Sequence, residues 1–289
     1  MTIQPPNITT IASALEWAAH ALADTSESAA RDARILLCAV LEVTPEYLIL
    51  YLERALTIEQ TAAFSKLVQQ RAQGVPVAYL LGRKGFYDIE VYVTPGVLIP
   101  RPETELLVEK AIAWATERHV LIIDVGTGSG AIALSLAKHL PQAHVTGIDI
   151  SEVALEVARR SAEKLNLAQR VRWLQGNLVQ PLLDAGETAD LIIANLPYIP
   201  SNELEHLEVA RHEPREALDG GLDGLDPIRQ LLRQAPGVMR QTSLIYLEIG
   251  AGQSQTIRDM VAQHFPALAI EAVEQDLAGH DRVVTLKLA

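Results

Sequence analysis

The sequence predicts an α/β protein, with a small all-α helical bundle followed by a seven-stranded, mostly parallel sheet. Apolar residues recur at three- and four-residue steps over the first 80 positions, which is the spacing of amphipathic helices. Beyond residue 96, short apolar segments alternate with helical patterns, as in a parallel sheet covered by helices on both faces. The length of 289 residues suits two domains, which we place at 1–80 and 97–289.

The first domain is expected to contain four or five short helices. Residues typical of turns at 24–26, 44–45 and 74–76 separate its helical segments. The last of these turns places the end of the bundle near Gly74. Cys38 is the only cysteine, so it forms no intramolecular disulfide, and its apolar surroundings predict a small buried side chain.

A β-hairpin at 81–96 is expected to link the two domains, because residues 86–93 alternate between apolar and polar side chains. The second domain then contains seven apolar segments with the length of strands. In chain order they are 119–124, 144–149, 171–174, 190–195, 243–249, 267–273 and 282–288. Only a short loop separates the last two, so we expect them to pair as an antiparallel hairpin at one edge of the sheet.

The charge and composition argue against several classes of protein. The chain has 36 acidic and 24 basic residues and a formal net charge of −12, whereas proteins that bind phosphate backbones usually carry a basic face. There is no signal-peptide pattern, no apolar run long enough for a membrane span and no His/Cys spacing typical of zinc sites. We therefore expect a cytoplasmic monomer that binds no membrane, no nucleic acid and no metal.

A glycine-rich loop, DVGTGSG, links the first strand to the helix that follows it. Glycines let the backbone approach a ligand closely, and the start of the next helix offers free N–H groups. Asp149 ends the next strand, where its carboxylate can accept both hydroxyls of a ribose. The combination predicts a cofactor that contains adenosine.

The loop alone leaves two kinds of cofactor open. Gly126, Gly128 and Ala131 also satisfy the pattern of dinucleotide-binding dehydrogenases. Two other residues favour S-adenosylmethionine. Asp124 can hold a water or the ammonium group of an amino-acid cofactor but would repel a pyrophosphate, and the Asn177 amide, after the third strand, can hydrogen-bond to an adenine edge.

The tetrad Asn195-Leu196-Pro197-Tyr198 follows the fourth strand, so it faces the same crevice as the glycine loop. The Asn195 side-chain oxygen and the Leu196 carbonyl could each accept one N–H of a planar amino group, while Pro197 restricts the turn and Tyr198 stacks on the group. Residues 191–200 contain no His, Asp or Glu, so no general base is evident. This pattern predicts methylation of a nitrogen attached to a π-system.

Together these motifs resemble the bacterial peptide chain release factor N5-glutamine methyltransferases of the HemK/PrmC family. The matching segments are YLLG at 79–82, FY at 86–87, TPGVLIPRPETE at 94–105, DVGTGSG at 124–130, NLPY at 195–198 and EPREALDGG at 213–221. They extend over nearly the whole chain. The LIPRPETE and EPREALDGG segments are far more specific than the glycine loop.

The resemblance implies a Rossmann-like class I methyltransferase domain that uses S-adenosylmethionine, and a helical domain that docks class 1 release factors. The target would be the glutamine of the Gly-Gly-Gln motif. The implied cofactor-binding residues are Asp124, Gly126, Thr127, Gly128, Ser129, Gly130, Asp149, Asn177, Leu178 and Asn195. The implied catalytic residues are Asn195, Pro197 and Tyr198, and Leu196, Pro100 and Arg101 would join them in contacting the substrate.

One residue departs from the family pattern, because the family usually has Pro-Pro in the tetrad and this chain has Leu196 before Pro197. A residue that acts through its backbone carbonyl can be leucine, with some loss of rigidity. The tetrad is also similar to that of ribosomal RNA adenine dimethyltransferases. A glutamine of a ribosomal protein and an adenine of DNA or RNA therefore stay open as alternative substrates.

Overall fold

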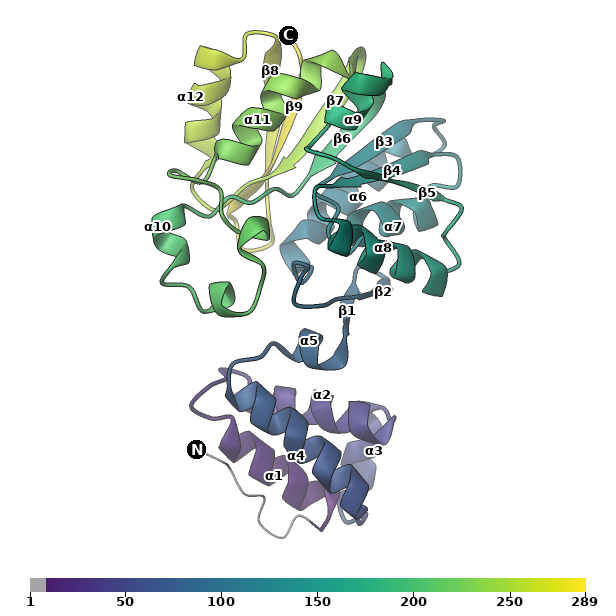
Figure 1. The fold of residues 1–289 in the computed structure, drawn as a ribbon, viewed down its shortest axis with the longest axis vertical. Coiled ribbons are helices and arrows are strands. Elements are labelled where there is room, and N and C mark those ends of the chain that lie inside the picture. Colours follow the sequence, from purple (N-terminus) through teal and green to yellow (C-terminus); the bar gives the residue numbers. More distant parts are fainter. Residues whose placement is uncertain (1–8) are drawn as a thin grey trace. The chain divides into compact units, whose positions relative to one another are not determined.

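The computed structural model describes residues 9–289 (Figure 1). The chain divides into two compact units between Gly82 and Arg83. Within residues 9–82 the first unit contains α1 (Ile11–Ala21), α2 (Ala29–Leu41), α3 (Pro45–Leu50), α4 (Ile58–Ala72) and α5 (Val77–Leu81). The sequence placed the end of the bundle near Gly74, but Gly74, with φ of +91°, only makes a turn, and Pro76 caps the further helix α5.

The core of the first unit forms where the apolar faces of its helices meet. The fully buried side chains include Leu22, Leu36, Leu48 and Phe64. Cys38 is only partly buried against this core. The helix ends are fixed locally, since the Thr10 and Thr57 side chains each accept a backbone N–H at the start of α1 and α4.

The second unit opens with an antiparallel hairpin, β1 (Arg83–Phe86) and β2 (Ile89–Tyr92). The short helix η1 (Pro102–Thr104) and helix α6 (Glu105–Ala115) come next. The hairpin is tied to α6, because the Tyr87 N–H in its turn donates to the Glu105 carboxylate at 2.9 Å.

A seven-stranded sheet forms the centre of the second unit, with the strand order β5-β4-β3-β6-β7-β9-β8. Its strands are β3 (Leu121–Val125), β4 (His144–Asp149), β5 (Val171–Gln175), β6 (Ala189–Ala194), β7 (Met239–Glu248), β8 (Leu268–Gln275) and β9 (Asp281–Leu288). The first five in the order run parallel, whereas β9 is antiparallel to both β7 and β8. The α/β fold class and the antiparallel pair at the edge are confirmed.

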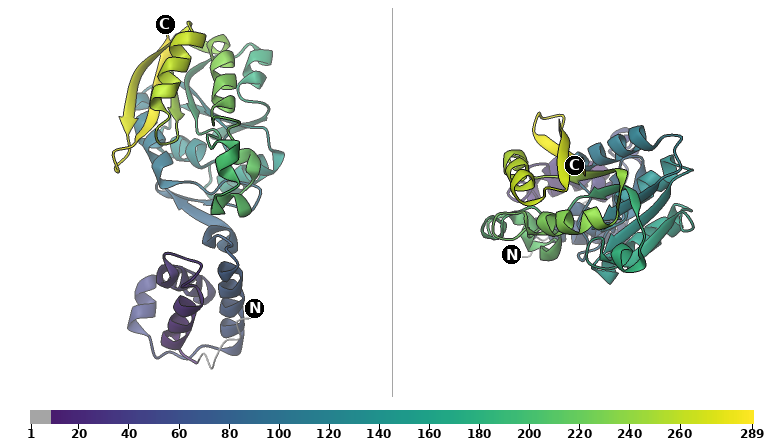
Figure 2. Two further views of the ribbon diagram at one scale, coloured as in Figure 1. Left: turned by 90° about the vertical axis from the view of Figure 1, so that its left-hand side faces the viewer. Right: turned by 90° about the horizontal axis from the view of Figure 1, so that it is seen from above.

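Helices cover both faces of the sheet (Figures 1 and 2). Ile123, Ile192 and Ile245 pair across β3, β6 and β7, and they belong to the core that α9 (Gln180–Ala185), α11 (Asp226–Gln234) and α12 (Ser254–His264) contribute to. Helices α6, α7 (Ala131–His139) and α8 (Glu152–Lys164) lie on the other face.

The remaining short helices lie in the loops of the second unit. They are α10 (Ser201–Leu204), η2 (Glu208–Arg211), η3 (Arg215–Ala217) and η4 (Ala235–Gly237). None of the helices within residues 9–289 is long and apolar enough to cross a bilayer. The strand order places β3 between β4 and β6, so the chain connections diverge at the carboxyl ends of these strands, which is where open α/β sheets bind ligands.

A buried ion pair joins two helices of the first unit. The Asp32 carboxylate on α2 accepts hydrogen bonds from Arg71 Nε on α4 and from Ser26 Oγ, both at 2.8 Å. The side chains of Arg71 and Asp32 are only 16% and 10% exposed. Removing the carboxylate would leave the guanidinium without its partner in a site with little access to water.

We therefore expect Asp32→Ala to lower the free energy of unfolding of the helical unit by about 3 kcal/mol, the usual cost of breaking a buried ion pair from one side. Urea unfolding of the full chain, with Trp114 and Trp173 replaced by phenylalanine so that Trp17 is the only fluorescent tryptophan, measures this change. Glu16→Ala on the exposed side of α1 is the control and should change the free energy by less than about 0.5 kcal/mol. Equal effects of the two substitutions would contradict the prediction.

Candidate active site

The glycine loop after β3 is held between β4 and the segment that follows β6. Gly126, Gly128 and Gly130 have φ of +72°, +55° and +81°, a region that favours glycine. The Gly126 N–H donates to the carbonyl of Ile148 at 2.8 Å. A Cβ at Gly126 would lie 3.2 Å from Leu196 Cδ2, and one at Gly130 would lie 3.0 Å from the Trp173 ring. Side chains at these positions would strain the backbone and push the loop away from its neighbours.

Asp124, the residue before Val125 and the loop, is completely buried. Its Oδ2 accepts hydrogen bonds from Thr127 Oγ1 at 2.6 Å and from the Ala133 N–H at 3.1 Å, in the first turn of α7. Its Oδ1 has no partner among the described residues. Burial raises the pKa of this carboxyl to about 7, and the nearby charge of Asp149 acts in the same direction. A buried acceptor without a donor fits the ammonium group of an amino-acid cofactor.

Asp149 lies at the end of β4 and is partly buried. Its Oδ2 accepts the Gly128 N–H at 2.8 Å, and its Oδ1 accepts the Ser151 N–H at 2.9 Å. Burial raises the pKa of this carboxyl above its usual range. Each carboxylate oxygen has a second lone pair, so Asp149 can hold the glycine loop in place and still accept hydroxyl groups.

The turn after β5 brings Asn177 and Leu178 to the neighbouring strand end. Asn177 is exposed, and Leu178 is partly buried against the core with φ of +56°, an uncommon value for a leucine. Thr127 and Ser129 in the glycine loop are buried. The structure thus brings the expected cofactor residues to one edge of the sheet, and their individual contacts with a cofactor stay predictions.

The tetrad continues from β6 at the same edge. Asn195 Nδ2 donates to Thr104 Oγ1 at 2.9 Å, and no hydrogen bond within residues 9–289 uses Asn195 Oδ1 or the Leu196 carbonyl. The Leu196 side chain is buried in the core, which anchors the backbone where the family usually has a proline ring. The Tyr198 carbonyl accepts from Gln253 Nε2 at 3.0 Å. Two acceptors therefore stay available beside the glycine loop.

The LIPRPETE and EPREALDGG segments meet at a buried glutamate. Glu213 accepts the Ile99 N–H at 2.9 Å and forms an ion pair with the Arg101 guanidinium. This pairing fixes the backbone on both sides of Pro100 and leads into η1, which carries Thr104. The Arg101 guanidinium already has a partner within the chain. The expected contact of Pro100 and Arg101 with a substrate stays a prediction.

Three residues that sequence reasoning did not select belong to this region: Thr104, Glu213 and Glu248. Glu248, the last residue of β7, is 1% exposed, and neither carboxylate oxygen has a hydrogen-bond partner among the described residues. Burial raises its pKa to about 7. The signal in the sequence is a single charged residue inside the apolar run SLIYLEIG. Thr104 and Glu213 carry no comparable signal of their own.

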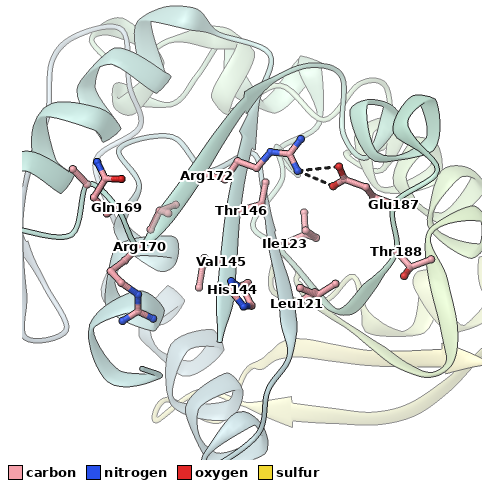
Figure 3. A pocket seen from close by; sticks show the side chains of 12 residues that line it. Leu121, Ile123, His144, Val145, Thr146, Gln169, Arg170, Arg172, Glu187 and Thr188 are labelled. Carbon is pink, nitrogen blue, oxygen red and sulfur yellow. Dashed lines mark hydrogen bonds and ion pairs between the residues drawn. The ribbon is translucent and has the colours of Figure 1, made fainter. Parts of the chain in front are cut away.

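A cavity of about 490 Å³ lies at the opposite end of the sheet (Figure 3). Its lining includes Leu121 and His144, which begin β3 and β4, and Arg172 on β5, whose guanidinium pairs with Glu187. The glycine loop and the tetrad follow the other ends of these strands. This cavity is therefore separate from the candidate active site.

Two family descriptions match the chain. The PrmC N-terminal domain matches residues 13–82, and a methyltransferase domain matches residues 122–212. The second match contains the glycine loop, Asp149 and the tetrad. The first ends at Gly82, where the two units of the structure divide.

Curated relatives resemble the chain over most of its length. The release factor glutamine methyltransferase of Moorella thermoacetica is 44% identical over 253 residues, covering 87% of this chain and 88% of the relative. That of Geobacter sulfurreducens is 39% identical over 284 residues, covering 97% and 98%. That of Bacillus anthracis is 34% identical over 278 residues, covering 94% and 96%.

Solved structures show the fold. A methyltransferase from Pyrococcus furiosus has 18% sequence identity and a TM-score of 0.53, with 71% of this chain and 91% of that chain covered. The catalytic domain of hMettl16, in complex with MAT2A 3′UTR hairpin 6, has 15% identity and a TM-score of 0.53, with 77% and 81% covered. The sheet domain has the class I fold of S-adenosylmethionine-dependent methyltransferases.

With curated relatives at 34–44% identity over most of its length, the chain belongs to the release factor glutamine methyltransferase family.

Proposed function

We propose that this protein transfers a methyl group from S-adenosylmethionine to the side-chain amide nitrogen of the glutamine in the Gly-Gly-Gln motif of class 1 peptide chain release factors. One observation carries the proposal. Asn195 donates its amide N–H to Thr104, so its oxygen stays available as an acceptor next to the Leu196 carbonyl and the glycine loop. Two adjacent acceptors match the two N–H groups of a primary amide. Family membership supports the choice of substrate.

The two acceptors address the weakness of an amide as a nucleophile. The lone pair of an amide nitrogen is delocalised into the carbonyl group, and hydrogen bonds from both N–H groups raise the electron density on that nitrogen. Asn195 Oδ1 and the Leu196 carbonyl make these bonds and fix the plane of the amide, while the Tyr198 ring packs on it. Directly after the transfer the nitrogen carries the new methyl group, both of its protons and a positive charge. This cation is strongly acidic, so one proton then leaves the nitrogen for water.

The residues after β3 and β4 suit a positively charged cofactor. When bound, S-adenosylmethionine supplies an electrophilic methyl group on a sulfonium centre. Asp124 Oδ1, buried and without a partner, would hold the ammonium group, and Asp149 would accept the ribose hydroxyls. Gly126 and Gly128 leave room for the methionine end, and Asn177 and Leu178 would flank the adenine.

The helical unit would dock the release factor. It presents four consecutive exposed or half-exposed apolar side chains at 49–52, from the end of α3 onward, and Ile58 at the start of α4 is 84% exposed. Exposed apolar side chains grouped in this way mark protein interaction surfaces. The acidic charge favours a protein over a nucleic acid as the substrate, and we expect the protein to act as a cytoplasmic monomer.

The proposal is tested by incubating the purified protein with S-adenosylmethionine carrying a deuterated methyl group. Separate reactions would contain a class 1 release factor, ribosomal proteins, DNA or RNA. Mass spectrometry should find the label on the Gly-Gly-Gln peptide of the release factor. Label on a ribosomal-protein glutamine or on adenine alone would instead support one of the two alternative substrates.

Asn195→Ala should reduce turnover on the order of 100-fold, because it removes one of the two acceptors, and should leave cofactor affinity within a few-fold. Asp149→Ala is the matched comparison and should weaken cofactor binding by at least about tenfold. Steady-state kinetics and calorimetry separate the two effects. Near-normal turnover by Asn195→Ala would contradict the role of the amide oxygen.

The pH dependence of cofactor binding should follow Asp124. Only its ionised form attracts an ammonium group, and the raised pKa of about 7 means that this form is lost as the pH falls through 7. The dissociation constant should therefore rise on the order of tenfold between pH 7.5 and pH 6. Asp124→Asn should bind more weakly at pH 7.5 and lose most of this dependence. An unchanged slope in the variant would assign the titration to another group.

A further inference from the structure

Glu248 lies at the active-site edge in a position that costs free energy, and the proposed reaction assigns it no role. It is 1% exposed, and both carboxylate oxygens lack hydrogen-bond partners within the described residues. A buried carboxylate is expensive unless other groups compensate for the lost water. Arg282 on β9 is the nearby cation, but its guanidinium donates to the Ile249 carbonyl and to Asp276.

The sheet register places Glu248 beside the tetrad. Ala194 on β6 pairs with Leu247 on the parallel strand β7, so Asn195 and Glu248 are the next residues on the two neighbouring strands. The hydroxyls of Thr104 and Tyr198 lie near the Glu248 carboxyl and lower its pKa, although neither forms a hydrogen bond with it among the described residues. Burial, and after it the charge of Glu248, raises the pKa of Tyr198 to about 12.

The hydrogen-bonding capacity of Thr104 connects Glu248 to Asn195. A hydroxyl has one proton to donate, and an ionised carboxylate can only accept. If the Thr104 proton points to Glu248, Thr104 Oγ1 is left as an acceptor, so Asn195 must present its NH₂ group. That is the arrangement observed, with Asn195 Nδ2 donating to Thr104 Oγ1 at 2.9 Å. The Asn195 oxygen is then turned toward the substrate.

We propose that Glu248 is a positioning residue, whose negative charge orients the hydroxyl of Thr104 and thereby sets the orientation of the Asn195 amide. The inference rests on the proposed function, because the direction of the Asn195 amide matters only if its oxygen accepts an N–H of the substrate. Glu248 itself does not touch the reacting atoms. Its contribution should appear in turnover and not in the binding of the cofactor.

The positioning role predicts a pH dependence with a definite sign. A protonated Glu248 no longer attracts the Thr104 proton, which is then free to face Asn195 and turns the amide the wrong way. The charges that face Glu248 are Arg282 from β9, which favours the ionised form, and Glu103 from η1, which disfavours it. Burial dominates and sets the pKa at about 7, so kcat at saturating cofactor and substrate should fall as the pH drops from 8 to 6.

The test compares wild type, Glu248→Gln and Glu271→Gln in release-factor methylation between pH 6 and 8. Glu248→Gln should lose at least tenfold in kcat at pH 8 and show a flat pH profile. Its KM values, and its cofactor affinity by calorimetry, should stay within threefold of wild type. Glu271 is an exposed carboxylate on β8 that pairs with Lys287, so its variant should behave as wild type.

A second variant keeps the test decisive if Glu248→Gln folds poorly. Thr104→Val breaks the same connection from the other side and should give a similar loss of kcat. The double variant should be no slower than the worse single variant, because both changes remove one interaction.

Two results would overturn the inference. One is a wild-type kcat and pH profile in Glu248→Gln, and the other is a loss confined to melting temperature and both KM values, which a purely structural role would give. Absence of transfer by the wild-type protein in the same assay would overturn the proposed function, and the inference with it. Normal transfer by wild type and by both variants would overturn the inference alone.

Discussion

The active site depends on the parallel pairing of β3 with β4 on one side and with β6 on the other. Parallel strands end at the same edge of a sheet, and the connections that leave β3 and β6 diverge there. The glycine loop and the tetrad are thereby brought together although they are distant in sequence. Their contact is direct, since the Leu196 side chain fits against Gly126, where a Cβ would lie 3.2 Å from it.

Three buried or partly buried carboxyl groups lie at this edge, each with a pKa raised by burial: Asp124, Asp149 and Glu248. The three carboxyl groups differ in how many hydrogen bonds their oxygens accept from the chain. Both oxygens of Asp149 accept backbone N–H groups, one oxygen of Asp124 does so, and neither oxygen of Glu248 has a partner among the described residues. A cationic cofactor beside Asp124 and Asp149 would offset the free-energy cost of burying their charges. Glu248 instead lies next to the tetrad, near the hydroxyl groups of Thr104 and Tyr198.

The loops around this edge supply and position side chains of the site, as the strand ends do. Glu213 joins the segment of Ile99 and Arg101 to the loop that follows the tetrad, and this brings Thr104 within hydrogen-bonding distance of Asn195. The LIPRPETE and EPREALDGG segments thus contact each other through Glu213 and position Thr104 together. The structure also shows how a leucine at position 196 is accommodated, because its side chain is buried in the core instead of restricting the backbone as a ring.

The sequence by itself determined the class of fold, the positions of the seven strands of the central sheet to within a few residues and the type of cofactor. These follow from local patterns: apolar runs, turn residues, and the glycines and Asp149 that end successive strands. It could not determine which side chains meet Asn195. Thr104 lies 91 positions away, and Glu213 pairs with Arg101 across 112 positions, so no local pattern records either contact. Glu248 was visible only as one charge in an apolar strand. The sheet register decided its neighbours, because pairing Ala194 with Leu247 is what places this carboxylate beside the tetrad.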